Sequence, residues 1–196
     1  MTIIPITSFD AAANYAHLPT VAIDIGCSGR NRSTGYDDGV GGAKNLRFNE
    51  AIKATAEFFR DRESQVLILE APLSGIFDEA GNHVARGDFE RIPSPRGWYY
   101  GAGASTCLGA LFFLRRLMQL LHRSKGKIHL LEGFVSRDDL VSHERVARAL
   151  RQSFTSPNKS EWPTFDTDTD RISILSLLGF GKETELPAVI MPRSVS

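Results

Sequence analysis

Four acidic features of the sequence stand where a carboxylate is either costly or chemically useful. Asp24, Glu70 and Glu132 each lie inside or at the end of an apolar run with the pattern of a strand. A buried charge is strongly unfavourable unless it is paired or bound to a metal ion. The fourth feature is the Asp166-Thr-Asp168-Thr-Asp170 segment, which precedes a short apolar stretch. The residue types therefore predict a carboxylate site for a metal ion.

Converging carboxylates suit magnesium, which prefers hard oxygen ligands and retains part of its water shell. Two such ions about 4 Å apart activate water and stabilise a leaving oxygen in phosphodiester cleavage. A central strand, its neighbour and a C-terminal helix would carry the acids in chain order. We predict a catalytic set of Asp24, Glu70, Asp166 and Asp170. We predict Mg²⁺ or Mn²⁺ bound by Asp24, Glu70, Asp170 and Glu132.

Each acidic feature also has a purely structural interpretation. Glu70 can simply mark the end of a strand, and Glu132 can form a salt bridge with His129 or a nearby arginine. Thr167 and Asp170 have the spacing of a capping box, and acids at a helix N-terminus interact favourably with the helix dipole. Capping and metal binding thus remain alternatives for the acids at 166 and 170.

Basic and aromatic side chains could form a surface for nucleic acid. Arg30 and Arg32 follow the strand of Asp24, where a phosphate near the metal would lie. Arg91, Arg96 and Trp98 belong to a segment able to pair with phosphates and stack on bases. The alternative is that the aromatic residues at 98–100 pack as a lid on the sheet. None of the five histidines has a metal-ligand spacing.

The elements that must position these residues follow from apolar periodicity and turn residues. Strands are expected at Thr20–Gly26, Gln65–Ala71, Lys127–Gly133 and Pro187–Met191, with a hairpin over Ile76–Arg86. Helices are expected at Phe48–Arg60, Ala104–Arg123, Ser136–Phe154 and Arg171–Leu178. Cys27–Asn45 has the composition of a loop or weak hairpin, Gly87–Gly101 that of a long loop, and Thr155–Thr164 that of a linker. The alternation of strands and helices predicts an α/β fold.

Length and composition limit the class of protein. The chain has 196 residues, 42% of them hydrophobic, which predicts a single domain over residues 20–196 after an N-terminal extension, residues 1–19. Lys plus Arg and Asp plus Glu each number 23, and this balance excludes a globally basic nucleic-acid coat. Cys27 and Cys107 cannot form a disulfide framework and are expected to be buried free thiols.

Targeting and membrane signals are not apparent in the sequence. Residues 1–19 lack the basic start and apolar core of a signal peptide. The most apolar stretch, Leu108–Leu121, contains Arg115 and Arg116, unlike a membrane span. We therefore expect a cytoplasmic protein with no membrane partner.

The order of these motifs resembles the RNase H-like superfamily in its RuvC-type arrangement. More closely, VAIDIG, LILEAPLSG, the GAGAST helix, HLLEGF and DTDTD resemble the nucleases classed as domain of unknown function 429. The resemblance covers roughly Val21–Phe180. It implies a central mixed sheet flanked by helices, with a hairpin after the first strand, and a divalent-metal nuclease site to which Asp24 and Glu70 carry over well. The acids at 166 and 170 match the acidic start of the last helix less closely. The expected partner is nucleic acid.

Two other functions remain open. The residues DIGCS at 24–28 also resemble the first phosphate loop of actin-like ATPases and sugar kinases, although those proteins need two such domains. A non-catalytic interaction module, which binds nucleic acid or protein through a degenerate site, is the stronger alternative. An intact set of carboxylates would favour the nuclease, and a missing one the module.

Overall fold

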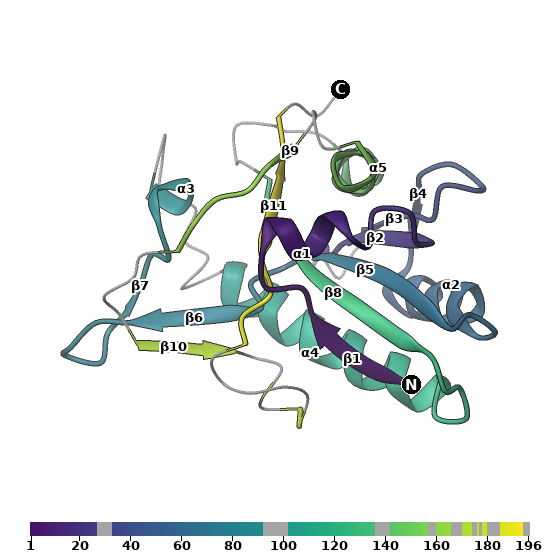
Figure 1. The fold of residues 1–196 in the computed structure, drawn as a ribbon, viewed down its shortest axis with the longest axis horizontal. Helices are drawn as coiled ribbons and strands as arrows, with labels where there is room; N and C mark the ends of the chain where they lie inside the picture. The colour runs from purple at the N-terminus through teal and green to yellow at the C-terminus, as the bar shows by residue number, and fades with distance from the viewer. Residues whose placement is uncertain are drawn as a thin grey trace.

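The computed structural model describes residues 1–26, 33–91, 102–135, 142–156, 160–165, 170–173, 176, 178–179 and 185–193. In this part of the chain, helices cover both faces of a mixed sheet, which confirms the predicted α/β class (Figure 1). The helices are α1 (Phe9–Ala13), α2 (Phe48–Phe59), α3 (Asp88–Arg91), α4 (Ala102–Leu120) and α5 (His143–Thr155). The strands are β1 (Thr2–Pro5), β2 (Thr20–Asp24), β3 (Thr34–Asp37), β4 (Lys44–Leu46), β5 (Ser64–Glu70), β6 (Ser74–Phe77), β7 (His83–Val84), β8 (Lys127–Gly133), β9 (Ser160–Glu161), β10 (Asp170–Ser173) and β11 (Val189–Pro192).

The main sheet has the order β4-β3-β2-β5-β8-β11-β9, and β1 also pairs with β8. β2, β5 and β8 run parallel to one another, whereas β3 and β4 form an antiparallel hairpin beside β2. The glycine-rich region expected to be a loop or weak hairpin thus supplies two strands. The hairpin extends the sheet beyond β2, and its first strand, β3, lies against α5.

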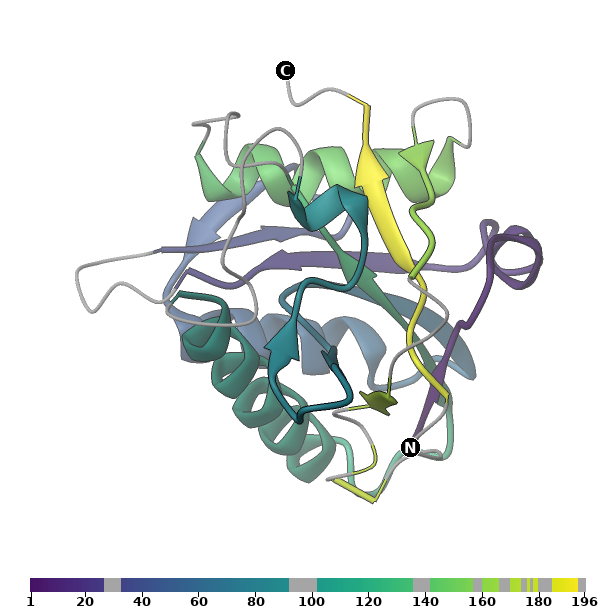
Figure 2. The same cartoon turned by 90° about the vertical axis from the view of Figure 1, so that its left-hand side faces the viewer.

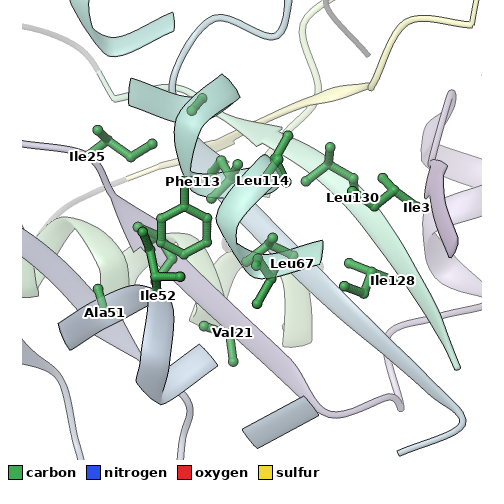
Figure 3. Close-up of a cluster of buried hydrophobic side chains, with 14 of the residues drawn as sticks. Ile3, Val21, Ile25, Ala51, Ile52, Leu67, Phe113, Leu114, Ile128 and Leu130 are labelled. Atoms are coloured by element: carbon green, nitrogen blue, oxygen red, sulfur yellow. The ribbon is translucent and has the colours of Figure 1, made fainter. Parts of the chain in front are cut away.

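The central strands are buried on both faces, as their almost continuous apolar sequences predict. On one face, Val21, Ile23 and Leu67 pack with α2 and α4 residues such as Phe113 (Figure 3). On the other face, Ala22 and Ile68 pack with α5. Figure 2 shows α4 and α5 on opposite sides of the sheet. Alternate residues of each strand therefore face different helices.

Residues 1–19 include a strand of the main sheet, β1. β1 pairs in parallel with β8, from Thr2 opposite Lys127 to Pro5 opposite Leu130. Ile3 and Ile6 are buried, one in each of the two cores. The short apolar run at the start of the chain pairs with an existing strand edge, and this long-range pairing is not visible in local sequence.

The segment after residue 169 differs from the prediction. The sequence predicts a helix at Arg171–Leu178, but residues 170–173 form β10, which pairs antiparallel with β6 in a second, three-stranded sheet, β10-β6-β7. Within β10, Ser173 is fully buried and Ile172 is 39% exposed, an alternation typical of a strand. Pairing with β6 thus prevails over the helical pattern of this short segment.

The other predicted elements are found close to their expected positions. α2, α4 and α5 overlap the predicted helices, β11 overlaps the predicted C-terminal strand, and β6 and β7 form the predicted hairpin. Gly81 allows the tight turn of that hairpin, because its φ is 81°. The linker predicted at Thr155–Thr164 contains β9. The first six residues of the helix predicted at Ser136–Phe154, residues 136–141, lie outside the described residues.

Candidate active site at the ends of β2 and β5

Asp24 and Glu70 lie side by side at the carboxyl ends of two adjacent parallel strands. They are direct partners in the register of β2 and β5, and neighbouring strands lie about 4.8 Å apart. Ala22 and Ile68, two residues before Asp24 and Glu70 respectively, pack toward α5. Because side chains alternate along a strand, both carboxylates lie on the same face, the α5 face. Asp24 is 5% and Glu70 4% exposed. The structure thus brings together two of the predicted site residues.

His143, the first residue of α5, joins this pair. Its Nδ1 lies 2.8 Å from Oδ2 of Asp24, and its side chain is 42% exposed whereas that of Asp24 is 7% exposed. The hydrogen bond that His143 donates to Asp24 raises the pKa of His143, with a further contribution from the charge of Asp24, although partial burial opposes the shift. The imidazole therefore links the buried carboxylate to the surface.

Two glycines allow the first turn of α5 to approach the sheet this closely. A Cβ on Gly35 would lie 2.0 Å from the backbone oxygen of His143. A Cβ on Gly26 would lie 1.8 Å from the backbone oxygen of Ser33 and 2.9 Å from Nε2 of His143. Both positions therefore exclude any side chain. The role of these glycines can be recognised only once the position of α5 is known. For that reason, the sequence alone does not predict that His143 belongs to the site.

Glu132 does not join the site. It pairs in register with Leu69 of β5, so it faces the α4 side of the sheet, opposite Asp24 and Glu70. Its Oε1 lies 2.5 Å from Nη2 of Arg86, and its Oε2 accepts hydrogen bonds from Nη1 of Arg86 and from the backbone N–H of Leu73, both at 2.8 Å. The structure therefore contains the salt bridge to an arginine that the sequence left open as an alternative for Glu132, and it does not bring this carboxylate to Asp24 and Glu70.

Arg86 is the centre of a buried polar network. Its side chain is 2% exposed and also pairs with Glu90, whose Oε1 lies 2.7 Å from Nη2. Nη1 donates to Oγ of Ser74 at 2.9 Å. The network connects α3 and β6 to the end of β8. Its two carboxylates share one arginine, and burial raises the pKa of Glu132 whereas Arg86 opposes that shift.

The acidic segment near the C-terminus is only partly described. Asp166 lies outside the described residues. Asp170 starts β10 and pairs with Phe77, the residue of β6 farthest from Glu70. Both views place β10 beside β6 and away from β2 (Figures 1 and 2). The backbone of Asp170 thus begins a strand, and the predicted helix-capping role does not apply to it.

Most of the predicted substrate contacts also lie outside the described residues: Arg30, Arg32, Arg96 and Trp98. Arg91 is described at the end of α3. Its Nη1 lies 3.4 Å from Oδ1 of Asp88, and Nη2 donates to the backbone oxygen of Ala85 at 3.3 Å. The side chain is 46% exposed, so it remains accessible to solvent.

We expect the stability contribution of His143 to depend on pH. Because its folded pKa is raised above the unfolded value, the protonated imidazole stabilises the fold fully below about pH 6.5, and the contribution is lost as pH rises through the folded pKa. His143→Gln should therefore lower the melting temperature at about pH 5.5 and have little effect at about pH 9. Thermal melts across this range measure it. His17→Gln, at an exposed position, is the control, and an equal loss at every pH would contradict the prediction.

Within the described ranges, no three histidine, cysteine, aspartate or glutamate residues are grouped so that they could hold a metal ion. Cys107, on α4, is a partly buried free thiol, and burial raises its pKa. No helix of the described chain is long and apolar enough to cross a bilayer.

Comparisons with protein-family models, with curated proteins and with solved structures found no match.

Proposed function

We propose that this protein is an RNase H-like nuclease that depends on a divalent metal ion. The fold supports this proposal through the hairpin β3–β4 that follows β2, because the resemblance in the sequence calls for a hairpin at that point. The observation that carries the proposal is the in-register pair of Asp24 and Glu70 on the α5 face, with His143 in contact with Asp24.

The donor set fits a hard divalent cation. Magnesium is commonly held by one or two carboxylates together with waters and substrate phosphates, and it does not need a third protein ligand. Asp24 and Glu70 would hold Mg²⁺ or Mn²⁺. Such an ion, when bound, activates water and stabilises the leaving oxygen of a phosphodiester. Both carboxylates are buried, and a cation bound between them would offset their negative charge.

His143 supplies an acid–base group beside the metal ligands. With Nδ1 bonded to Asp24, the neutral imidazole donates its Nδ1 proton to the carboxylate and leaves Nε2 as the acceptor. Histidine is the side chain whose ordinary pKa lies closest to neutral pH, and the contact with Asp24 raises the pKa of His143. In this proposal His143 moves a proton at Nε2, and Asp24 orients its ring. A positioned acid–base group of this kind contributes about 10²–10⁴-fold to a rate.

Cleavage assays with Mn²⁺ test the proposal. We expect cleavage of at least one of four labelled probes, namely single-stranded DNA, duplex DNA, single-stranded RNA and an RNA–DNA hybrid, and loss of cleavage with a chelator. Glu70→Gln should lower the rate by more than about tenfold, because one ligand charge is lost. Glu63→Gln removes an exposed carboxylate next to the opposite end of β5 and should leave the rate unchanged.

A non-catalytic binding module is the second candidate. It is favoured by the finding that the described residues contain no group of three potential metal ligands. A module would bind one of the four probes without cleaving any of them, and Glu70→Gln would leave the affinity unchanged or higher, because a negative charge is removed. Binding without cleavage in Mn²⁺ would overturn the nuclease proposal in favour of the module.

A further inference from the structure

His143 is placed by a helix whose other contacts with the sheet are mostly apolar. Val146, Ala147, Leu150 and Phe154 of α5 are all buried. Apolar contacts are non-directional, whereas charged and hydrogen-bonded contacts favour one position of the helix along its axis. The contact between His143 and Asp24 depends on that position, because a shift of one residue moves a helical side chain by about 1.5 Å along the axis.

One ion pair connects α5 to the end of β3. Nε of Arg151 lies 2.9 Å from Oδ2 of Asp37, whose side chain is 2% exposed, whereas that of Arg151 is 22% exposed. Oδ1 of Asp37 accepts a hydrogen bond from the backbone N–H of Gly39 at 2.9 Å, which holds the carboxylate in place. A Cβ on Gly39 would lie 2.8 Å from Nη1 of Arg151, so the guanidinium packs against that glycine.

A second polar contact holds the first turn of α5. Asn45 of β4 donates a hydrogen bond from Nδ2 to Oε2 of Glu144, the residue after His143. Oε1 of Glu144 accepts a hydrogen bond from Oγ of Ser142 at 2.6 Å. The hairpin therefore contacts α5 at both ends of the stretch from 144 to 151, about two turns apart.

We infer that Asp37 and Arg151 are positioning residues, and that their ion pair sets the axial position of α5 and thereby holds the imidazole of His143 against Asp24. This inference rests on the proposed function only for its effect on catalysis; the placement of the ring is a property of the fold itself. Neither residue touches the carboxylate pair of the site. Both act through the helix and the hairpin.

The variant that tests the inference is the double substitution Asp37→Asn with Arg151→Met. Asn keeps an oxygen for the N–H of Gly39, and Met keeps an unbranched stem, so no buried charge is left unpaired. Arg151→Lys alone should retain part of the native positioning of the His143 ring, since lysine keeps the positive charge but lacks the planar guanidinium. Asp38→Asn is the matched control: Asp38 is adjacent in sequence, and its carboxylate bonds to Tyr36, Val40 and Gly41 of its own hairpin.

Two measurements separate positioning from a merely structural role. The first is the nuclear Overhauser contact between the His143 ring and the Hα atoms of Gly26. The native protein should show it, because a Cβ on Gly26 would lie only 2.9 Å from Nε2 of His143. It should disappear in the double variant and persist in Asp38→Asn. The second is the kinetics of Mn²⁺-dependent cleavage, in which kcat should fall about 10–100-fold with little change in KM.

The outcomes distinguish this inference from the proposed nuclease function. If the native protein does not cleave but the double variant loses the ring contact, the positioning inference stands and the proposed function fails. If the native protein cleaves and the double variant keeps both the ring contact and its kcat, the positioning inference is overturned and the proposed function stands. An equal loss of ring contact in Asp38→Asn would also overturn it, since general loosening of the hairpin would then be the cause.

Discussion

Replacing Asp24 by Asn should abolish Mn²⁺-dependent cleavage while the protein stays folded. Asn has the shape of Asp without the charge. The substitution therefore weakens both metal binding and the charged interaction with His143. We expect a fall in rate greater than about 100-fold, larger than for Glu70→Gln, because a supporting residue alone contributes about 10–100-fold. The amide oxygen still accepts a hydrogen bond from neutral His143, and the repulsion between neighbouring carboxylates is relieved. The rate of cleavage and a thermal melt, with and without Mn²⁺, measure the effect.

The control for Asp24→Asn is Asp10→Asn, at an exposed position in α1. It should leave both the cleavage rate and the increase in melting temperature caused by Mn²⁺ unchanged. Asp24→Asn should lose that increase, because a ligand that binds only the folded state raises its stability. A variant that keeps the Mn²⁺ increment and cleaves at the native rate would remove Asp24 from the site.

Arg86→Met should destabilise the fold far more than Asp24→Asn or Glu70→Gln. Methionine fills a similar volume but leaves Glu90 and Glu132 buried without a positive partner. Removing one member of a buried ion pair costs about 3–5 kcal/mol, which corresponds to a fall in melting temperature of roughly 6–20 °C for a chain of this length. Chemical denaturation and thermal melts measure it.

Acid should partly rescue the Arg86→Met variant. Without the guanidinium, the hydrogen bond from Leu73 still opposes the effect of burial, but the larger opposing contribution is gone and the pKa of Glu132 rises further above its unfolded value. The folded state then gains stability as pH falls through the folded pKa, because the neutral form is the one that burial favours. The difference in melting temperature between native and variant protein should narrow toward about pH 5. Arg91→Met, at a half-exposed position, should change stability by less than about 0.5 kcal/mol. A small, pH-independent loss in Arg86→Met would show that the network contributes little.

The sequence predicts the parts of this protein that depend on local pattern. Continuous apolar runs locate β2, β5 and β8, and 3.6-residue periodicity locates α2, α4 and α5. The placement of Asp24 and Glu70 at neighbouring strand ends follows from the same reasoning, since parallel strands bring their carboxyl ends to one edge. These predictions need no knowledge of distant contacts.

The parts that sequence reasoning missed all depend on partners far along the chain. β1 and β10 are short, and each is stabilised by pairing with the edge of a strand that is distant in sequence. β1 pairs with β8, and β10 pairs with β6. Glu132 has the sequence context of a ligand, but its partner Arg86 is 46 positions away. His143 contacts Asp24 across 119 positions, and the sequence features that permit this contact are two distant glycines, Gly26 after β2 and Gly35 in β3. Short segments and single side chains carry too little local information to predict such pairings.

The edge of β8 is divided between two strands that are far apart in the sequence, one before β8 and one after it. β1 covers Lys127–Leu130, and β11 covers Glu132 and Gly133. The backbone of β8 can therefore open in two separate steps, and loss of β11 exposes only the stretch that carries Glu132. During folding, this stretch remains an uncovered β edge, able to pair with another molecule, until residues 189–190 arrive. Protection of this edge thus depends on a segment that is synthesised well after β8 itself.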